Sequence, residues 1–99
     1  MNAENFTQVI AAIDADPSIW DQSEWHSWCM TKHCFAGHAQ ILSGAPFKRR
    51  AGGDDLRLFT RSDAVRWLDL KVDEADYLFN PSRTMDDFRD FLKQHQAKL

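Results

Sequence analysis

The stretch WHSWCMTKHCFAGHA, residues 25–39, decides the centre of the fold of this 99-residue chain and holds most of its reactive side chains. It contains both cysteines, three of the four histidines and two of the four tryptophans. Thiol and imidazole groups at this density can bind a transition metal, form a reactive thiolate or pack into a core. Any site chemistry of the chain is therefore expected in this stretch.

The second half of the stretch predicts the central helix of the fold. Thr31 is a suitable N-cap, and Gly44 with Pro46 closes the helix. Gly37 lowers helix propensity by about 1 kcal/mol relative to alanine, which indicates that another element packs closely at this point. The side chains predicted to face inward are Cys34 or Phe35, His38, Ala39 and Leu42.

The residues that precede the stretch predict a helix and a short helical turn. The helix begins behind an Asn2 cap and ends near Asp14. Its inward residues, which recur with helical spacing, are Phe6, Val9, Ile10 and Ile13. Asp16 and Pro17 then favour a short helical segment, with Asp16 as its cap. This segment carries Ile19 and Trp20 inward.

Three more helices are predicted after the central one. They begin at Ser62, at Asp73 and at the capping box Thr84-Met85-Asp86-Asp87, and Asn80-Pro81 ends the second of them. The inward residues of these three helices are Ala64, Val65, Trp67 and Leu68, then Ala75, Leu78 and Phe79, then Phe88, Phe91, Leu92 and His95.

Residues 47–59 interrupt the helical pattern. Gly52-Gly53-Asp54-Asp55 is a turn signal, and Leu56-Arg57-Leu58 alternates as a strand does, so a small β-hairpin is predicted near residues 47–59. The fold class predicted from the whole chain is mainly α. The expected architecture is a compact single-domain helical bundle of about five helices over residues 1–99.

Composition and charge narrow the classes of function. The formal net charge is −3, which does not favour attraction to nucleic acid. The basic cluster Lys48-Arg49-Arg50 is interpreted as part of a solvated loop, whereas acidic residues dominate from Asp63 to Asp90. No run approaches the roughly 20 apolar residues of a membrane span, and the N-terminal residues lack the pattern of a secretory signal. We expect a cytoplasmic chain with reduced thiols.

Cys29-Met30-Thr31-Lys32-His33-Cys34-Phe35-Ala36-Gly37-His38-Ala39 resembles a motif of small, uncharacterised bacterial and phage proteins, which reads Cys-Gly-Thr, two residues, Cys, one residue, Ala-Gly, Trp or His, Ala. The segment from Ala64 to Phe79 is similar too, and together they cover about two thirds of the chain. Met30 and Asp69 stand where the motif and the later segment usually have glycine. The resemblance implies a shared helical fold and a prokaryotic or phage origin, and it implies no activity.

A metal site is one interpretation of the cysteine and histidine cluster. Cys34 and His38 are four residues apart, which places them on one face of a helix. Cys29 and His26 or His33, from the preceding loop, would complete four ligands, and zinc is the metal that such a set favours. The crowding of all candidates into thirteen residues is unlike the two separate pairs of most structural zinc sites.

Thiol catalysis is a second interpretation. Cys34 would stand in the first turn of the central helix, where the helix dipole lowers the pKa of a thiol, and His38 would be the neighbouring base. The sequence shows no third polar group to orient that base. The four residues between Cys29 and Cys34 also differ from the spacing of thioredoxin-like redox motifs. Plain packing of a small buried thiol is the simpler explanation of Cys34, because cysteine is among the residues most often buried.

DNA binding is a third interpretation, since the segment from Ser62 to Phe79 has the form of a helix-turn-helix with a tight turn at Leu70-Lys71-Val72. The second helix would begin with carboxylates, at Asp73, Glu74 and Asp76, where a recognition helix meets phosphates. Charge therefore argues against nucleic acid as the partner. Two short helices that close the domain would produce the same pattern.

The interpretation we favour is a small domain that binds another macromolecule, most simply a protein, and needs no cofactor. A convincing catalytic set is missing, and eleven tryptophans and phenylalanines are many for a chain of this size. An inhibitor of a host enzyme or defence complex, encoded by a phage, would have this form. An acidic surface would meet a basic target. The predicted contact residues are Trp20, Trp25, Asp73, Glu74, Asp76, Asp86 and Asp87.

Overall fold

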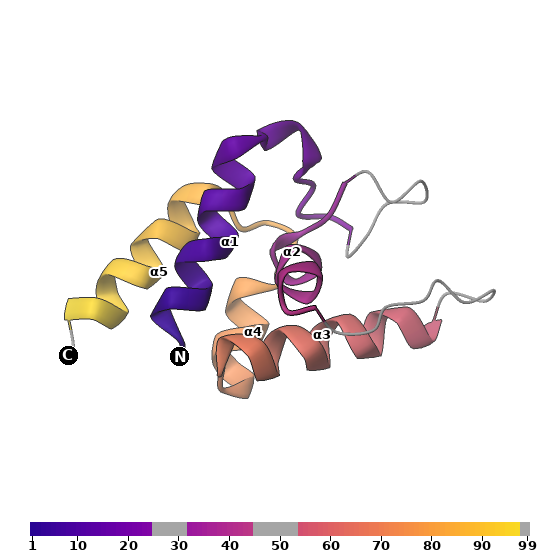
Figure 1. The fold of residues 1–99 in the computed structure, drawn as a ribbon. Coiled ribbons are helices and arrows are strands. Elements are labelled where there is room, and N and C mark those ends of the chain that lie inside the picture. Colours follow the sequence, from indigo (N-terminus) through magenta and orange to yellow (C-terminus); the bar gives the residue numbers. More distant parts are fainter. Residues whose placement is uncertain (25–31, 45–53, 98–99) are drawn as a thin grey trace.

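The computed structural model describes residues 1–24, 32–44 and 54–97, with the backbone alone described for 54–59. Within these residues the chain forms five α-helices and one 3-10 turn (Figure 1). The predicted class, a mainly helical bundle, is confirmed. The elements are α1 (Ala3–Ala15), η1 (Pro17–Ile19), α2 (Phe35–Leu42), α3 (Asp54–Leu68), α4 (Val72–Leu78) and α5 (Met85–Ala97).

Helix α1 forms as its sequence predicts. The side chain of Asn2 accepts a hydrogen bond from the backbone N–H of Asn5 at 2.9 Å and caps the helix. The buried face of the helix consists of the four predicted residues, Phe6, Val9, Ile10 and Ile13. Asp16 then caps η1 through the N–H of Ser18, and Pro17 occupies its first position.

The segment after η1 runs beside the residues that lead into α2. The N–H of His33 donates to the carbonyl of Ile19 at 2.8 Å, the N–H of Asp21 donates to the carbonyl of His33 at 3.0 Å, and the N–H of Cys34 donates to the carbonyl of Glu24 at 2.7 Å. These bonds hold residues 33 and 34 extended. The helix therefore begins at Phe35 with Cys34 as its N-cap.

Two predictions for α2 are wrong: the residue that caps the helix and the burial of Leu42. Thr31 lies outside the described residues, and the cap is Cys34, whose Sγ accepts from the N–H of Gly37 at 3.4 Å. Leu42, expected to face inward, is 39% exposed because the helix turns its last residues away from the core. Gly44 ends the helix as predicted, with a φ of +72° that L side chains rarely adopt.

The predicted hairpin near residues 47–59 is wrong where the structure describes it, because residues 54–59 belong to α3. Residues 47–53 lie outside the described part. The helix also begins eight residues before the expected Ser62 cap. Two aspartates at its start favour a helix N-terminus electrostatically, and the strand-like alternation spans only three residues, so a fifteen-residue helix prevails.

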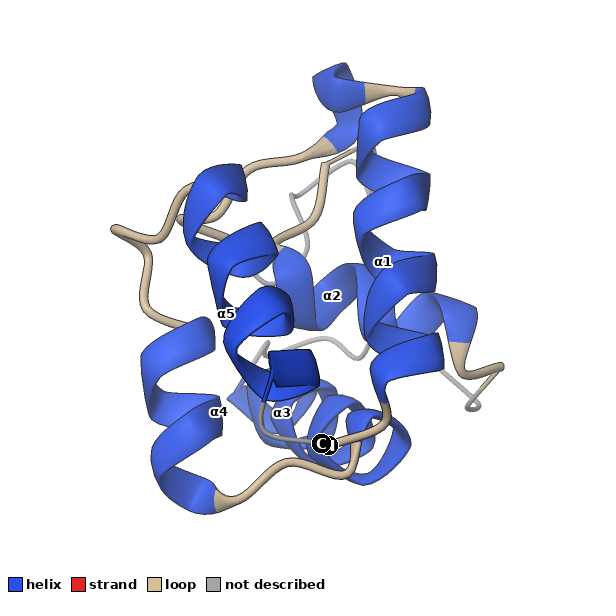
Figure 2. Ribbon diagram, turned by 90° about the vertical axis from the view of Figure 1, so that its left-hand side faces the viewer, coloured by secondary structure: helices blue, strands red, loops and turns tan. Residues whose placement is uncertain are grey.

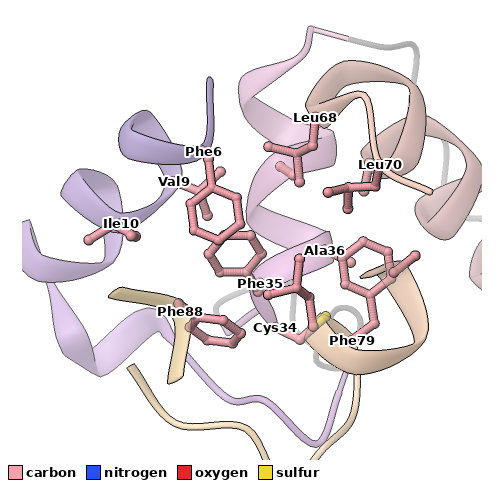
Figure 3. Packing of buried hydrophobic residues seen from close by; sticks show 14 of the residues in the cluster. Phe6, Val9, Ile10, Cys34, Phe35, Ala36, Leu68, Leu70, Phe79 and Phe88 are labelled. Carbon is pink, nitrogen blue, oxygen red and sulfur yellow. The ribbon is translucent and has the colours of Figure 1, made fainter. Parts of the chain in front are cut away.

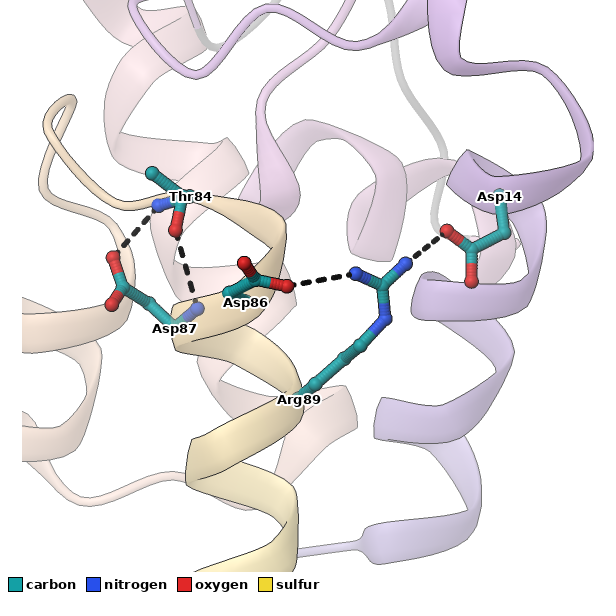
Figure 4. Close-up of polar contacts among 5 residues, drawn as sticks. All are labelled: Asp14, Thr84, Asp86, Asp87 and Arg89. Atoms are coloured by element: carbon teal, nitrogen blue, oxygen red, sulfur yellow. Dashed lines mark hydrogen bonds and ion pairs between the residues drawn. The ribbon is translucent and has the colours of Figure 1, made fainter.

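Helices α4 and α5 have different capping arrangements. Helix α4 is capped at Lys71, whose N–H donates to the Glu74 carboxylate at 2.8 Å, so the expected cap Asp73 lies inside the first turn instead. The predicted capping box of α5 is confirmed (Figure 4): the N–H of Thr84 donates to Asp87 at 2.8 Å, and the N–H of Asp87 donates to the Thr84 hydroxyl at 3.3 Å.

The core lies where α1, α2 and α5 meet, with α3 and α4 closing it from below in the view of Figure 1. The rings of Phe6, Phe35 and Phe88 form its centre (Figure 3), with centroids 4.8 Å apart for Phe6 and Phe35 and 4.3 Å apart for Phe35 and Phe88. All three are fully buried. Figure 2 shows α5 beside α1. Arg89 of α5 joins the two helices through an ion pair with Asp14 at 2.5 Å (Figure 4).

A buried polar network joins α2 to α3. The amide of Gln40 donates to the Asp63 carboxylate at 3.0 Å, and the hydroxyl of Thr60 donates to the Gln40 carbonyl oxygen at 2.9 Å. Thr60, Ala64 and Leu68 are fully buried on one face of α3. Ala36, Gly37 and Ala39 are buried on α2, which confirms that another element packs closely against this helix.

Candidate functional site

Cys34 is buried at the start of α2 rather than exposed in its first turn. Its side chain is bonded to the helix itself, through the N–H of Gly37, and only 3% of the residue is exposed. Burial raises the pKa of the Cys34 thiol from its usual 9.0 to about 11, although hydrogen bonds from the N–H groups of Gly37 and Ala36 oppose this shift. The expected lowering of this pKa by the helix dipole is wrong, because desolvation outweighs it.

His38 lies one turn further along α2 and is also buried. Its Nδ1 is 3.0 Å from the carbonyl oxygen of Cys34. A carbonyl oxygen only accepts, so Nδ1 carries the proton and Nε2 presents a lone pair. That Nε2 has no hydrogen-bond partner in the described part of the chain. Burial lowers the pKa of His38 below its usual 6.5, with the contacts to the carbonyls of Cys34 and His33 opposing the shift.

The remaining members of the predicted metal set are distributed unevenly. Cys29 and His26 lie outside the described residues. His33 is buried beside His38, with ring centroids 5.4 Å apart and planes at 87°. Over residues 1–24, 32–44 and 54–97, no group of three or more histidine, cysteine or acidic side chains is arranged to hold a metal ion. The zinc site therefore remains a prediction.

A cysteine-dependent reaction is not supported by Cys34 and His38. The thiol is protonated at neutral pH, the imidazole faces the Cys34 carbonyl through Nδ1, and both groups are closed off from solvent. A nucleophile needs the thiolate form and access to substrate. What the pair does instead is fix the first turn of α2 against the core.

A second candidate site is the exposed face of α4, which we call the α4 surface and define as Val72, Asp73, Asp76 and Tyr77. All four are exposed, whereas Ala75 and Leu78 of the same helix are buried. Helical spacing puts Asp73, Asp76 and Tyr77 opposite the buried pair, and Val72, three residues before Ala75, at the edge of the exposed side. Val72 is 73% exposed and Tyr77 is 40% exposed, which makes them two of the exposed large hydrophobic residues of the described chain. The α4 surface thus combines apolar area with two carboxylates.

Neighbouring groups hold the α4 surface in place. The ring of Tyr77 stacks on that of Phe91 from α5, with centroids 6.0 Å apart. The guanidinium carbon of Arg83 lies 4.1 Å from the Tyr77 ring centroid, and Arg83 Nε donates to the Tyr77 carbonyl at 3.0 Å. Asp76 accepts from Arg61 of α3 at 2.7 Å. Tyr77 is therefore a fixed, partly exposed aromatic side chain.

The predicted contact residues fall into three groups. Trp20 is half-buried against the core, with its Nε1 bonded to Gln22 at 3.2 Å and its ring edge-on to Phe88, and Trp25 lies outside the described residues. Glu74 and Asp87 cap helices. The exposed remainder is Asp73 and Asp76 on α4 and Asp86 on α5, of which Asp86 accepts from Arg89 at 3.4 Å.

Sequence reasoning did not single out Val72 or Tyr77. The sequence pattern predicts Val72 in the turn before the helix and gives no face for Tyr77. The signal was present for Tyr77: once Ala75 and Leu78 are placed inward, a period of 3.6 residues puts positions 73, 76 and 77 on the opposite face. It was not present for Val72, which stands three residues before Ala75 and would be placed beside the inward residues.

A tight turn joins α3 to α4, as in a helix-turn-helix, but it comprises residues 69–71, and Val72, expected in the turn, begins α4. Asp69 adopts a φ of +53° there, and the N–H of Leu70 donates to the carbonyl of Val65 at 3.0 Å. Asp73 and Asp76 stand on the exposed face of the second helix, where they would repel phosphate groups. Among the described helices, none is long and apolar enough to cross a membrane.

Comparisons with known proteins add no relative. No family model matches the chain, and neither a curated protein nor a solved structure is significantly similar to it. The motif resemblance to small bacterial and phage proteins stays a prediction.

Proposed function

We propose that the chain is a small protein-binding module that has no catalytic chemistry of its own and docks its partner on the α4 surface. The observation that carries the proposal is the exposure of Val72 and Tyr77 on α4, where the ring of Phe91 stacks on that of Tyr77 and holds it in place. Aromatic residues such as tyrosine concentrate binding energy at protein interfaces. A rigid side chain also loses little entropy when a partner binds.

The proposal includes the setting predicted from the sequence. The module would act in the cytoplasm of a bacterium or of a phage-infected cell, and inhibition of a host enzyme or defence complex is the activity that such a module suits. Its small size and the burial of its thiol support a role in binding rather than in turnover. The partner would be a protein and not a nucleic acid, because carboxylates surround the apolar residues.

Photocrosslinking tests the proposal. A photoreactive phenylalanine analogue replaces Val72 in one preparation and the exposed Gln8 of α1 in another, and both are irradiated in a lysate of the source organism. We expect a discrete protein adduct from position 72 that is lost when Tyr77→Ser is added. Identical adducts from positions 72 and 8, or none from position 72, would contradict the proposal.

One observation favours zinc binding as a second candidate function. His38 donates Nδ1–H to a backbone carbonyl and leaves Nε2 unpartnered, which is how metal-binding histidines are commonly oriented. The other ligands of such a metal would be Cys34 and, from the preceding loop, Cys29 and His26. The chain would then be a metal-dependent domain or enzyme. Native mass spectrometry of protein purified without chelator tests this: a stoichiometric zinc that Cys34→Ser removes supports it, and an apo protein contradicts it.

A further inference from the structure

We infer that the α4 surface receives a protein segment that presents arginine side chains, and that Arg61 and Arg83 of this chain occupy the places of those side chains in the free protein. The inference rests on the proposed function and adds the chemistry of the partner. It is carried by the contacts that these two arginines already make with residues of the α4 surface.

Asp76 holds the first of these arginines. Arg61 Nη2 lies 2.7 Å from Asp76 Oδ1, while the side chains of Arg61 and Asp76 are 33% and 67% exposed. An ion pair this exposed contributes about 0–1 kcal/mol, since water and salt compete for both groups. An incoming guanidinium can take the place of Arg61 at the Asp76 carboxylate, because it offers the same planar donors.

The ring of Tyr77 holds the second arginine. The guanidinium carbon of Arg83 stands 4.1 Å from the ring centroid, within the range of a cation–π contact. Phe91 stacks against the same tyrosine at 6.0 Å and an interplanar angle of 23°, so the ring is held in a fixed orientation. The surface therefore already binds guanidinium groups in the two ways that proteins commonly use, by a carboxylate and by an aromatic face.

Charge and shape favour an arginine-bearing partner over other segments. Residues 69–90 carry seven carboxylates against three basic side chains. Asp73 makes no hydrogen bond or ion pair in the described chain, so one carboxylate of the α4 surface is open to a partner. Val72, at 73% exposure, can pack against the aliphatic stem of an arginine. Complementary charge also speeds encounter with a basic segment.

A peptide titration of the full chain tests the inference. The probe is a twelve-residue peptide of alternating arginine and alanine, and a lysine–alanine peptide is its counterpart. Binding is followed by amide chemical shifts in two-dimensional NMR spectra, which report both the location and the Kd. We expect shifts confined to α4 and the start of α5, weaker binding at higher salt, and weaker binding of the lysine peptide.

Variants of the chain should change the affinity for the arginine peptide in opposite directions. The double variant Asp73→Asn with Asp76→Asn should weaken binding of the arginine peptide by roughly tenfold, whereas Glu4→Gln removes an exposed carboxylate of α1 and should change the Kd by less than about twofold. Arg61→Ala and Arg83→Ala should each tighten binding by roughly two- to fivefold, because each frees an occupied position. The spectra of the unbound variants confirm the fold.

Three results would overturn the inference: shifts spread over all acidic parts of the chain, equal affinity for the lysine peptide, or weaker binding in both arginine variants. The proposed function would fail separately. An adduct at position 72 that survives Asp73→Asn with Asp76→Asn would leave the protein-binding module standing and eliminate arginine as its ligand. If the arginine peptide binds as expected while position 72 gives no adduct, the α4 surface binds arginine, and the proposed docking of a protein partner at this surface is contradicted.

Discussion

The imidazole Nδ1 of His38 lies 3.0 Å from the carbonyl oxygen of Cys34, and this contact determines which face of the ring meets the core. With the proton on Nδ1, the lone pair of Nε2 points into a region that offers it no hydrogen bond in the described chain. The neutral ring tolerates this position, but a protonated ring would bring a charged N–H without an acceptor. The contact thus ties the charge state of one histidine to the packing of α2.

Stability is predicted to fall on acidification because of His38. Burial lowers the pKa of His38 in the folded state below its usual 6.5, so the unfolded chain binds the proton more tightly. The stabilising effect of the neutral buried ring is fully present above pH 6.5 and is lost as the pH falls below that value. The loss can reach about 1.4 kcal/mol per pH unit until the folded-state pKa is passed. Urea unfolding at several pH values between 5 and 8 measures it.

The variant His38→Gln assigns this pH dependence. Its free energy of unfolding should vary less between pH 6.5 and pH 5 than that of the parent, because glutamine does not titrate. His95→Gln, which removes a half-exposed histidine of α5, is the matched control for loss of an imidazole. An unchanged slope in His38→Gln would show that another group causes the acid loss.

Cys34 is predicted to react slowly with thiol reagents in the folded protein. Its pKa is raised to about 11 by burial, so only a minute fraction is thiolate at pH 8, and the side chain is 3% exposed. Iodoacetamide labelling of a Cys29→Ser variant, followed by intact mass, should be far slower than labelling of the same protein in urea. Similar rates in the two conditions would mean that the first turn of α2 opens often enough to expose Cys34, and would support a reactive thiol.

The elements that the sequence predicts well are those whose caps and apolar faces lie close together in the chain. Asn2 and the box of Thr84 and Asp87 identify the starts of α1 and α5, because each cap bonds a backbone N–H three residues away. The apolar residues that follow them repeat with helical spacing over several turns. Local chemistry is sufficient for such helices, and no distant contact has to be known.

The start of α2 could not be predicted because distant residues set it. The carbonyls of Ile19 and Glu24 accept from the N–H groups of His33 and Cys34 and keep that segment extended, so the helix cannot begin after Thr31. The properties of the Cys34 and His38 pair also depend on residues that are distant in the sequence. The i and i+4 spacing of Cys34 and His38 is visible in the sequence, but their burial, which raises one pKa and lowers the other, depends on how other helices cover α2.

The capping box of α5 is predicted to contribute measurably to stability. Thr84→Ala removes the hydroxyl that accepts from the N–H of Asp87 and should lower the free energy of unfolding by about 1 kcal/mol. Thr84→Ser keeps that acceptor and should cost less than half as much. Ser18→Ala, at an exposed site in η1 where the hydroxyl is a donor to Asp16, is a control for loss of a surface hydroxyl. Equal losses in Thr84→Ala and Thr84→Ser would exclude the cap as the cause.

Gln22 is predicted to be the polar side chain on which the fold depends most. It is 7% exposed and joins three segments: its Oε1 accepts from the N–H of Phe35 at 3.0 Å and from Trp20 Nε1, and its Nε2 donates to the carbonyls of Leu78 and Asn80 at 3.0 and 3.1 Å. Gln22→Leu should lower the free energy of unfolding by about 3 kcal/mol, because buried backbone groups lose their partners.

Substitution of Gln22 by glutamate separates these hydrogen bonds from packing. Glutamate keeps the acceptors for Phe35 and Trp20, but its second oxygen would face the carbonyls of Leu78 and Asn80, so Gln22→Glu should be destabilised at pH 7. Relative to the parent at each pH, it should recover on acidification, since a protonated carboxyl can donate one of the lost bonds. Gln8→Leu on exposed α1 controls for loss of an amide. Losses in Gln22→Leu no larger than in Gln8→Leu, measured by urea unfolding, would show that Gln22 does not join these segments.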